Sequence, residues 1–284
     1  MKHLFTNKST NGRLILIQNE IELKGNYFEE DTNFTFHTIA WNRGESQIVK
    51  IDHVEHLFEK NTILPLMLNQ SYSFERAVDI VAWQFNREFY CILNHDAEVG
   101  CVGFLFFGPT TTMFINLDGE FQFRLNDLLQ IFVEEFESED NVQGDMLRML
   151  LVRLIIKLTR IAKKQYIEKD PINEKQFNII RQYNLLVELN FKKEHQVKFY
   201  AEQLNKSPKT ISNIFSMYSK KSPINIIHDR IITEAKRLVY YTDKSIKEIS
   251  VELGFEDAAH FSKFFKNYTS VSPSELKKAT VDSI

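Results

Sequence analysis

Two short segments near the C-terminus carry side chains that could recognise a nucleic acid. Residues 197–223 and 246–273 each contain a helical pattern that starts after a residue typical of a helix N-cap, Ser207 or Asp257. The side chains outside the apolar face of these helices are Lys209, Thr210, Ser212, Asn213, Ala258, Ala259, His260, Ser262 and Lys263. Asparagine can form two hydrogen bonds with adenine, and lysine can bind guanine or a phosphate. We interpret these nine residues as a candidate DNA-contacting set.

The histidines and cysteines do not form a catalytic or metal-binding pattern. A metal-dependent enzyme needs about three converging ligands at an open site. The histidines that could supply them in the first half are His37, His53, His56 and His95, and they include no His-x-His pair. Cys91 and Cys101 are too few for a disulfide framework or a four-cysteine zinc site, and no Ser-His-Asp, phosphate-loop or dinucleotide motif occurs. We predict no catalytic residues, no metal and no cofactor.

The two candidate segments are copies of one pattern. Residues 197–223 and 246–273 each show a short amphipathic helix, a turn, a second amphipathic helix and a closing Ser-Pro. The turns contain Asn205 and Gly254, residue types that accept positive φ after a helix. The identical residues, all offset by 50 positions, are Ser212/Ser262, Phe215/Phe265, Tyr218/Tyr268, Ser222/Ser272 and Pro223/Pro273. Two helices joined by a tight turn predict a helix-turn-helix, although two such hairpins could also simply pack as an α-bundle.

A longer amphipathic helix connects the copies. The stretch 224–241 places its apolar residues on one stripe, formed by Ile227, Ile231, Ala235, Leu238 and Val239. A helix of this length extends roughly 25 Å. It could hold the two second helices about one DNA turn, roughly 34 Å, apart, so that each enters a major groove.

The stretch 230–278 resembles the signature of the AraC/XylS family of bacterial transcription regulators. The matching residues are Ala235, Leu238, Ser245, Ile246, Ile249, Leu253, Gly254, Phe255, Phe261, Phe264, Phe265, Lys266 and Pro273. The resemblance covers about 100 residues and implies a domain with two helix-turn-helix motifs that binds double-stranded DNA and regulates transcription, most often as an activator. By position, the nine candidate residues would fall on its two recognition helices.

The chain departs from the family pattern in two places. The family usually has glycine before each Ser-Pro closure, where this chain has Lys220 and Ser270. If the backbone keeps a positive φ there, each substitution costs roughly 1 kcal/mol. Ala258 and Ala259 offer no hydrogen bonds to bases, so the second recognition helix would read thymine methyl groups or contact mainly phosphates.

The first half of the chain predicts strands followed by helices. Short β-branched and aromatic stretches with turn signals occur at 34–41, 77–85, 102–108 and 112–117. Helical spacing begins at Asn126 and continues in a Leu/Ile stripe over 145–163. From the residues alone this half is a β-sandwich or barrel with helices, and the resemblance implies a cupin-like barrel. The aromatic residues that alternate as in a barrel interior are Phe34, Phe36, Trp41, Trp83, Phe85, Phe104 and Phe106.

A polar segment divides two halves of opposite charge. The linker, Lys163–Lys175, is interrupted by Pro171. Residues 1–169 hold 17 basic and 24 acidic residues, whereas residues 170–284 hold 18 and 14. The charges and the linker predict an α+β chain divided into residues 1–169 and 170–284. The resemblance implies a cupin-like sensor and dimerisation domain for the first part and an all-α DNA-binding domain for the second.

The expected partners follow from this division. They are double-stranded DNA and, by the habit of the family, a second copy bound through the helices of the first domain. RNA polymerase and a small-molecule effector remain open as further partners, and a protein without an apolar leader or span is expected to be cytoplasmic, with no membrane partner. The alternative is an effector-binding or enzymatic cupin whose helical half is a protein-interaction module.

Overall fold

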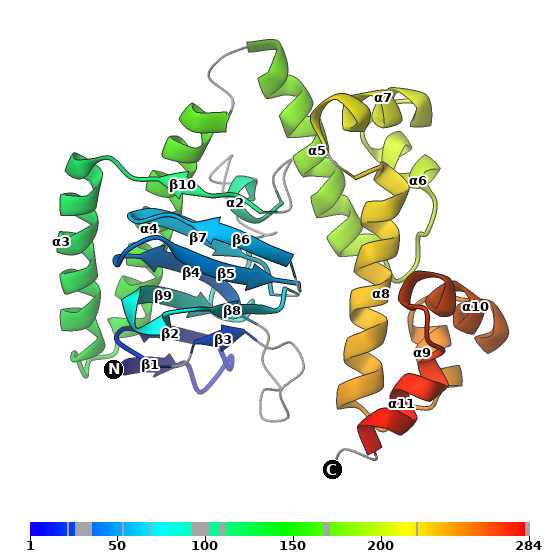
Figure 1. The fold of residues 1–284 in the computed structure, drawn as a ribbon, viewed down its shortest axis with the longest axis horizontal. Coiled ribbons are helices and arrows are strands. Elements are labelled where there is room, and N and C mark those ends of the chain that lie inside the picture. The colour runs from blue at the N-terminus through cyan, green and yellow to red at the C-terminus, as the bar shows by residue number, and fades with distance from the viewer. Residues whose placement is uncertain are drawn as a thin grey trace. The chain divides into compact units, whose positions relative to one another are not determined.

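The chain forms two compact units, one built from residues before 174 and the other from residues 174–284 (Figure 1). The computed structural model describes residues 1–21, 23–25, 36–52, 54–68, 70–92, 103–107, 112–166, 171–219 and 221–281. All described strands lie in the first unit, and the second is helical. Among the described residues, no helix combines the length and apolar character needed to cross a lipid bilayer.

The first unit contains two antiparallel sheets. One has the strand order β1-β2-β9-β4-β7-β10 and the other β3-β8-β5-β6. The strands are β1 (Lys2–Thr6), β2 (Arg13–Ile17), β3 (Lys24–Gly25), β4 (His37–Asn42), β5 (Gln47–Ile51), β6 (Val54–Phe58), β7 (Thr62–Leu66), β8 (Tyr72–Phe74), β9 (Ile80–Phe85) and β10 (Ile115–Asn116). Neither sheet closes on itself among the described strands. The fold is thus mixed, with sheets first and helices last, and the cupin-like barrel stays a prediction.

Alternating side chains of the central strands fill the space between the sheets. Ala40 of β4 and Ala82 of β9 belong to a buried cluster that also contains Val49 and Phe58 of the four-stranded sheet. The Tyr72 hydroxyl crosses the gap, lying 2.8 Å from the Thr38 hydroxyl and accepting a 2.8 Å hydrogen bond from the Gln84 amide. Small apolar residues bring the sheets together, and the buried polar groups satisfy one another. The predicted strands at 34–41 and 77–85 are confirmed over β4 and β9.

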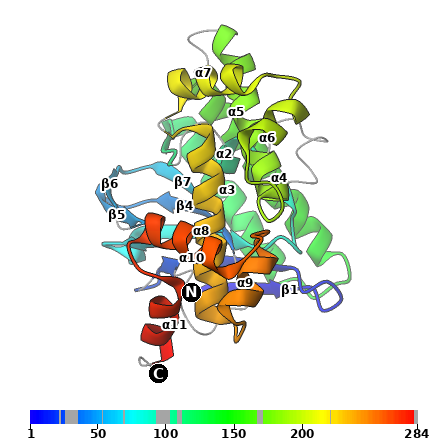
Figure 2. The ribbon, with the colours of Figure 1, turned by 90° about the vertical axis from the view of Figure 1, so that its right-hand side faces the viewer.

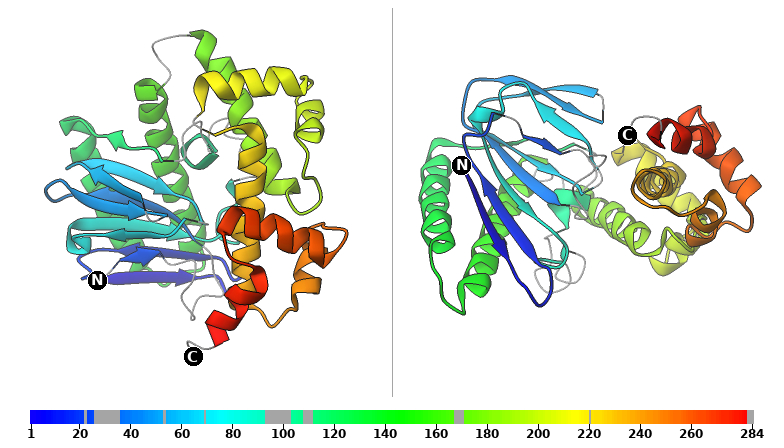
Figure 3. Two further views of the ribbon diagram at one scale, coloured as in Figure 1. Left: turned by 45° about the vertical axis from the view of Figure 1, so that its right-hand side comes forward. Right: turned by 90° about the horizontal axis from the view of Figure 1, so that it is seen from below.

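Helices cover the other face of the six-stranded sheet. They are α2 (Phe104–Phe107), α3 (Gly119–Phe136) and α4 (Gln143–Tyr166), and Figure 3 shows α3 and α4 along this sheet. Trp83 lies 5.9 Å from Phe132 of α3, and Phe85 lies 6.0 Å from Phe106 of α2, measured between ring centroids. The expectation that these aromatic residues line a barrel interior is therefore wrong for Trp83 and Phe85. They alternate as predicted, but they face the helices rather than the second sheet.

Two further expectations need correction. The stretch 102–108 was expected to be a strand, but residues 104–107 form helix α2. All four are buried, and an apolar run without alternation does not distinguish a strand from a helix. Helix α3 starts at Gly119, seven residues before the expected change of period, because the Asp118 side chain caps it by accepting a hydrogen bond from the Phe121 amide. Phe34, His53, His95 and Cys101 lie outside the described residues.

The second unit is organised around one central helix, α8. Its helices are α5 (Pro171–Asn190), α6 (Val197–Gln203), α7 (Pro208–Tyr218), α8 (Pro223–Tyr241), α9 (Ile246–Glu252), α10 (Ala258–Thr269) and α11 (Pro273–Val281). In Figure 2, α6 and α7 lie toward one end of α8, and α9 and α10 lie toward the other. The predicted stripe of the connecting helix is confirmed, because Ile227, Ile231 and Ala235 are completely buried in the core.

The ends of the predicted linker are helical. Residues 163–166 complete α4, and α5 begins at Pro171. Proline suits the first position of a helix, where its missing N–H has no helical partner. Pro171 therefore starts a helix here.

Candidate nucleic-acid interface

The first motif consists of α6, a turn at Asn205 and α7. Asn205 has a φ of +53°, and the amide of Lys206 donates to the carbonyl of Ala201 across the turn. Ser207 caps α7 by accepting a 3.1 Å hydrogen bond from the Thr210 amide, and Pro208 occupies the first helical position. The predicted turn and cap are confirmed.

The second motif repeats this geometry with different residues. Gly254 has a φ of +76°, and the amide of Phe255 donates to the carbonyl of Ser250. Asp257 caps α10 by accepting a 2.7 Å hydrogen bond from the His260 amide. The same five-residue hydrogen bond closes both turns, so the internal repeat is a structural duplication.

Each Ser-Pro closure starts the next helix. Ser222 caps α8 by accepting from the Asn225 amide, and Ser272 accepts from the Glu275 amide at the start of α11. Ser270 has a φ of +66°, so the expected strain at this non-glycine position is present. Lys220, the corresponding residue of the first motif, lies outside the described residues.

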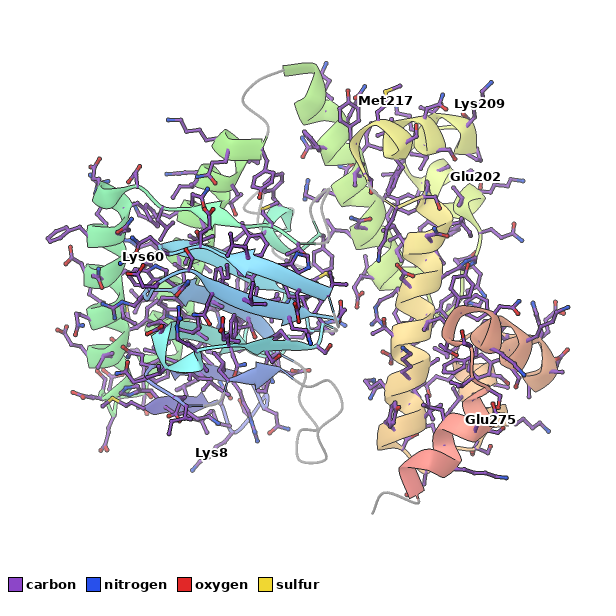
Figure 4. The ribbon with its side chains drawn as sticks, in the orientation of Figure 1. Lys8, Lys60, Glu202, Lys209, Met217 and Glu275 are labelled. Carbon is purple, nitrogen blue, oxygen red and sulfur yellow. The ribbon has the colours of Figure 1, made fainter. Side chains whose placement is uncertain are left out.

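The four candidate residues of α7 lie on its solvent face. Lys209, Thr210, Ser212 and Asn213 are all exposed, whereas Ile211 between them is completely buried. The Thr210 hydroxyl is 2.9 Å from the Ser207 hydroxyl, and no hydrogen bond involves the side chains of Ser212 and Asn213 among the described residues. Figure 4 shows Lys209 at the beginning of α7, with Met217 near its end. This face offers hydroxyl, amide and ammonium groups to a ligand.

The five candidate residues of α10 offer fewer polar groups. Ala259, His260 and Lys263 are exposed, and Ala258 is half-buried. Ser262 is also half-buried, and its hydroxyl donates a 2.7 Å hydrogen bond to the Ala258 carbonyl. The remaining polar side chains of the set are therefore those of His260 and Lys263. The structure thus places all nine predicted residues on the second helices of the two motifs.

Sequence reasoning missed a cleft between the motifs. It has a volume of about 610 Å³ and is bordered by the turn before α6, by α6 itself and by the turn between α9 and α10. Its charged side chains are those of Lys193, Lys198, Glu194, Glu202 and Glu256, and the rings of His195 and His260 also line it. The signal in the sequence is the polar run 192–196, which precedes the first motif. The cleft arises from contacts between segments about 60 residues apart.

A buried carboxylate group organises the centre of the unit. Glu234 of α8 accepts hydrogen bonds from Arg237 at 2.8 Å and Arg230 at 3.2 Å, and Arg230 also forms two bonds with Glu188 of α5, at 2.6 and 3.0 Å. Burial would raise the pKa of Glu234, but the hydrogen bond from Arg237 and the charges of Arg230, Arg237 and Lys192 outweigh it. They lower this pKa to about 2. Glu234 is therefore ionised and held by cations from several directions.

Comparison with known proteins finds similar helix-turn-helix sequences for the region of the motifs. Residues 200–279 match the family model described as a helix-turn-helix domain. An uncharacterised HTH-type transcriptional regulator of Haemophilus influenzae is 25% identical over 156 residues, which are 55% of this chain and 52% of that protein. The HTH-type transcriptional activator RhaS of Mannheimia succiniciproducens is 31% identical over 97 residues, which are 34% of this chain and 36% of RhaS.

The matches cover parts of these relatives. The chain spans about half, or less, of the length of the curated relatives it matches. A crystal structure of ToxT from Vibrio cholerae aligns with 95% of this chain and 98% of its own, at 14% identity and a TM-score of 0.43. The family-model match falls on the duplicated motifs. Residues 200–279 are therefore similar to the helix-turn-helix domain of transcription regulators.

Proposed function

We propose that this protein is a sequence-specific DNA-binding transcription regulator that inserts α7 and α10 into adjacent major grooves. The observation that carries the proposal is the duplicated, capped motif, whose second helices expose polar and basic side chains within a matched helix-turn-helix domain. A helix fits the major groove, and its N-terminal residues reach base edges. The nine residues identified above would make these contacts, with Lys209 and Lys263 available for phosphates or guanine.

The relatives support the direction of regulation. RhaS is named a transcriptional activator, and it is 31% identical to this chain over 97 residues. We therefore propose an activator that works in the cytoplasm and contacts RNA polymerase when bound beside a promoter.

The first unit would control or pair the DNA-binding domain. We assign a cupin-like sensor and dimerisation role to residues 1–169 and DNA binding to residues 170–284. Phe123 of α3 and Met149 of α4 are 69% and 68% exposed, and Met146 is exposed about one turn before Met149 on α4. Exposed apolar side chains on surface helices favour pairing with a second copy. Analytical ultracentrifugation should then show a dimer that Met149→Lys weakens.

An effector would bind among the aromatic residues on the helix-covered face of the six-stranded sheet. His37 is buried there, 4.8 Å from Phe106 between ring centroids, and burial lowers its pKa to about 3, so it is neutral. Its Nδ1 has no hydrogen-bond partner within the described part of the chain. A partly hydrophobic ligand with one polar group suits these surroundings. Trp83 lies on the same face and should report such binding by a change in fluorescence.

The decisive test is in vitro selection of random duplex DNA by the full chain at near-physiological salt. We expect one or two enriched motifs separated by about one helical turn, and an affinity that falls steeply as salt rises. DNA retention that does not depend on salt would contradict the proposal, and the absence of any DNA retention would favour the protein-interaction alternative.

A further inference from the structure

The two helix-turn-helix motifs touch each other directly, in addition to their connection through α8. The turn before α6, residues 191–196, packs against the turn between α9 and α10, residues 253–257. A Cβ atom on Gly254 would lie 2.2 Å from the carbonyl oxygen of Lys192, and the rings of His195 and Phe255 are 4.9 Å apart. We call these two turns the inter-motif joint.

Lys192 links the joint to two helices. Its Nζ lies 2.7 Å from Glu252 Oε1 at the end of α9 and 3.5 Å from Glu234 Oε1 on α8. One cation that precedes the first motif thus binds a carboxylate of the connecting helix and a carboxylate of the second motif. A pair of partly buried ions in such a fixed geometry restricts relative movement of the elements that carry them.

The other ion pairs anchor the two carboxylates independently. Glu234 is also held by Arg230 and Arg237, and Glu252 is held by Lys244 at 2.5 Å. Because Arg230 is bound in turn to Glu188, the chain of ion pairs runs from α5 through α8 to α9. Only Lys192 joins the Glu234 group to the Glu252 group in the described ion pairs.

We propose that the inter-motif joint fixes the distance and angle between α7 and α10, and that Lys192 is a positioning residue through which the protein selects one spacing between its two half-motifs in DNA. A single helix such as α8 connects the motifs at one side only, so bending or twisting at its ends would change their relative placement. The joint adds a second connection. The inference rests on the proposed function, because it concerns how the two recognition helices are placed for adjacent grooves.

The structure offers a substitution that removes the connection and little else. In Lys192→Met, the aliphatic part of the side chain is kept, Glu234 retains two arginines and Glu252 retains Lys244. No buried carboxylate is therefore left without a cation, and the variant should fold. The matched control is Lys193→Met, which removes an exposed lysine that borders the same cleft and takes part in none of the described ion pairs.

The first experiment measures affinity for duplexes in which the two selected half-motifs are moved apart or together by one or two base pairs. Each base pair turns one half-site by about 34° relative to the other, because a helical turn contains about 10.5 base pairs. For the original chain and Lys193→Met, we expect a displacement of one base pair to lower affinity about 30-fold or more, as the contacts of one motif are lost. For Lys192→Met, the same displacement should lower affinity less than about 5-fold.

The second experiment does not require DNA. Spin labels are attached at Ser216→Cys on α7 and Asn267→Cys on α10, both exposed, in a full-length chain whose Cys91 and Cys101 are replaced by serine. Pulsed electron paramagnetic resonance then gives the distribution of distances between the labels. Lys192→Met should broaden the distribution, whereas Lys193→Met should leave it unchanged.

The two experiments separate the failure of this inference from that of the proposed function. If the original chain binds DNA but Lys192→Met keeps both the sharp spacing preference and the narrow distance distribution, the joint does not position the motifs. An original chain that binds every spacing equally would overturn the inference in the same way. If the original chain binds no DNA, the proposed function fails, and the distance distribution alone decides whether Lys192 holds the motifs together.

Discussion

In the first motif the turn residue is Asn205, and the four outward side chains of α7 are all exposed and polar. In the second motif the turn residue is Gly254, two of the five outward residues of α10 are alanines, and the Ser262 hydroxyl is bonded to its own helix. The backbones agree in their turns, caps and Ser-Pro closures. The motifs therefore share one scaffold but present different surfaces to a ligand.

The surroundings of the motifs differ as well. The first packs on α5 through aromatic rings, with Phe215 4.9 Å from Tyr183, whereas the second meets the turn before α6 so closely that Gly254 has no room for a side chain. A duplicated motif can thus keep its fold while its two copies take different roles in binding. We expect α7 to supply most of the base recognition and α10 to supply phosphate and shape contacts.

The largest expected effect is on the free energy of unfolding, and it should differ between substitutions in the two turns. Gly254→Ala should destabilise the second unit by about 3 kcal/mol or more, because the new methyl group would meet the Lys192 carbonyl at a position that already needs positive φ. Asn205→Ala should cost only about 1 kcal/mol, since nothing but the φ preference changes. Urea denaturation followed by far-ultraviolet circular dichroism measures both, and equal losses would show that the joint is not tightly packed.

The next effect tests where base recognition lies. Asn213→Ala on α7 should reduce affinity for the selected site about 5- to 100-fold and relax the preference at one base pair, because an amide that can bond adenine is lost. Ser262→Ala on α10 should change affinity less than about 3-fold, since its hydroxyl is already bonded to the Ala258 carbonyl. Repeating the selection with each variant gives the measurement. A larger effect of Ser262→Ala would reverse the comparison between the motifs.

Phosphate contacts should be more evenly shared. Lys209→Ala and Lys263→Ala should each weaken binding to all sequences and lower the slope of log affinity against log salt by about 1, because one released counterion is lost. Titrations between low and physiological salt measure the slope for each variant. If Lys209→Ala instead changed the base preference without changing the slope, Lys209 would be reading guanine.

The smallest effect concerns the end of α10. Ser270 adopts a φ of +66°, which glycine adopts without steric cost, so Ser270→Gly should stabilise the protein by up to about 1 kcal/mol. A thermal melt compares this variant with the original chain, and Ser219→Gly serves as a control because the φ of Ser219 is −131°. The control should be neutral or destabilising. Stabilisation of the same size in both variants would point to a cause other than the left-handed backbone.

Much of the second unit could be predicted because its signals are local. Ser207 and Asp257 cap helices through hydrogen bonds from residues three positions further on. Asn205 and Gly254 form turns through their own positive φ angles. The apolar stripe on α8 follows from the helical period. Interactions between residues three or four positions apart can be inferred directly from the amino-acid sequence. The nine candidate residues could be placed on recognition helices for the same reason.

Features that depend on contacts between residues far apart in the sequence could not be predicted and were found only in the tertiary structure. Phe104–Phe107 form a helix because an apolar run that is buried on all sides shows no alternation that would distinguish a helix from a strand. Trp83 and Phe85 do alternate, but alternation alone does not say that their face of the sheet packs on α3 and α2. In the sequence, Lys192 is one charged residue of a polar turn. In the folded protein it forms ion pairs with Glu234 and Glu252, which lie 42 and 60 residues further along the chain. The two motifs and the side chains that they expose could be predicted from local patterns alone. Only the tertiary structure determined how they are joined, because that joint is made of contacts between segments that no local pattern relates.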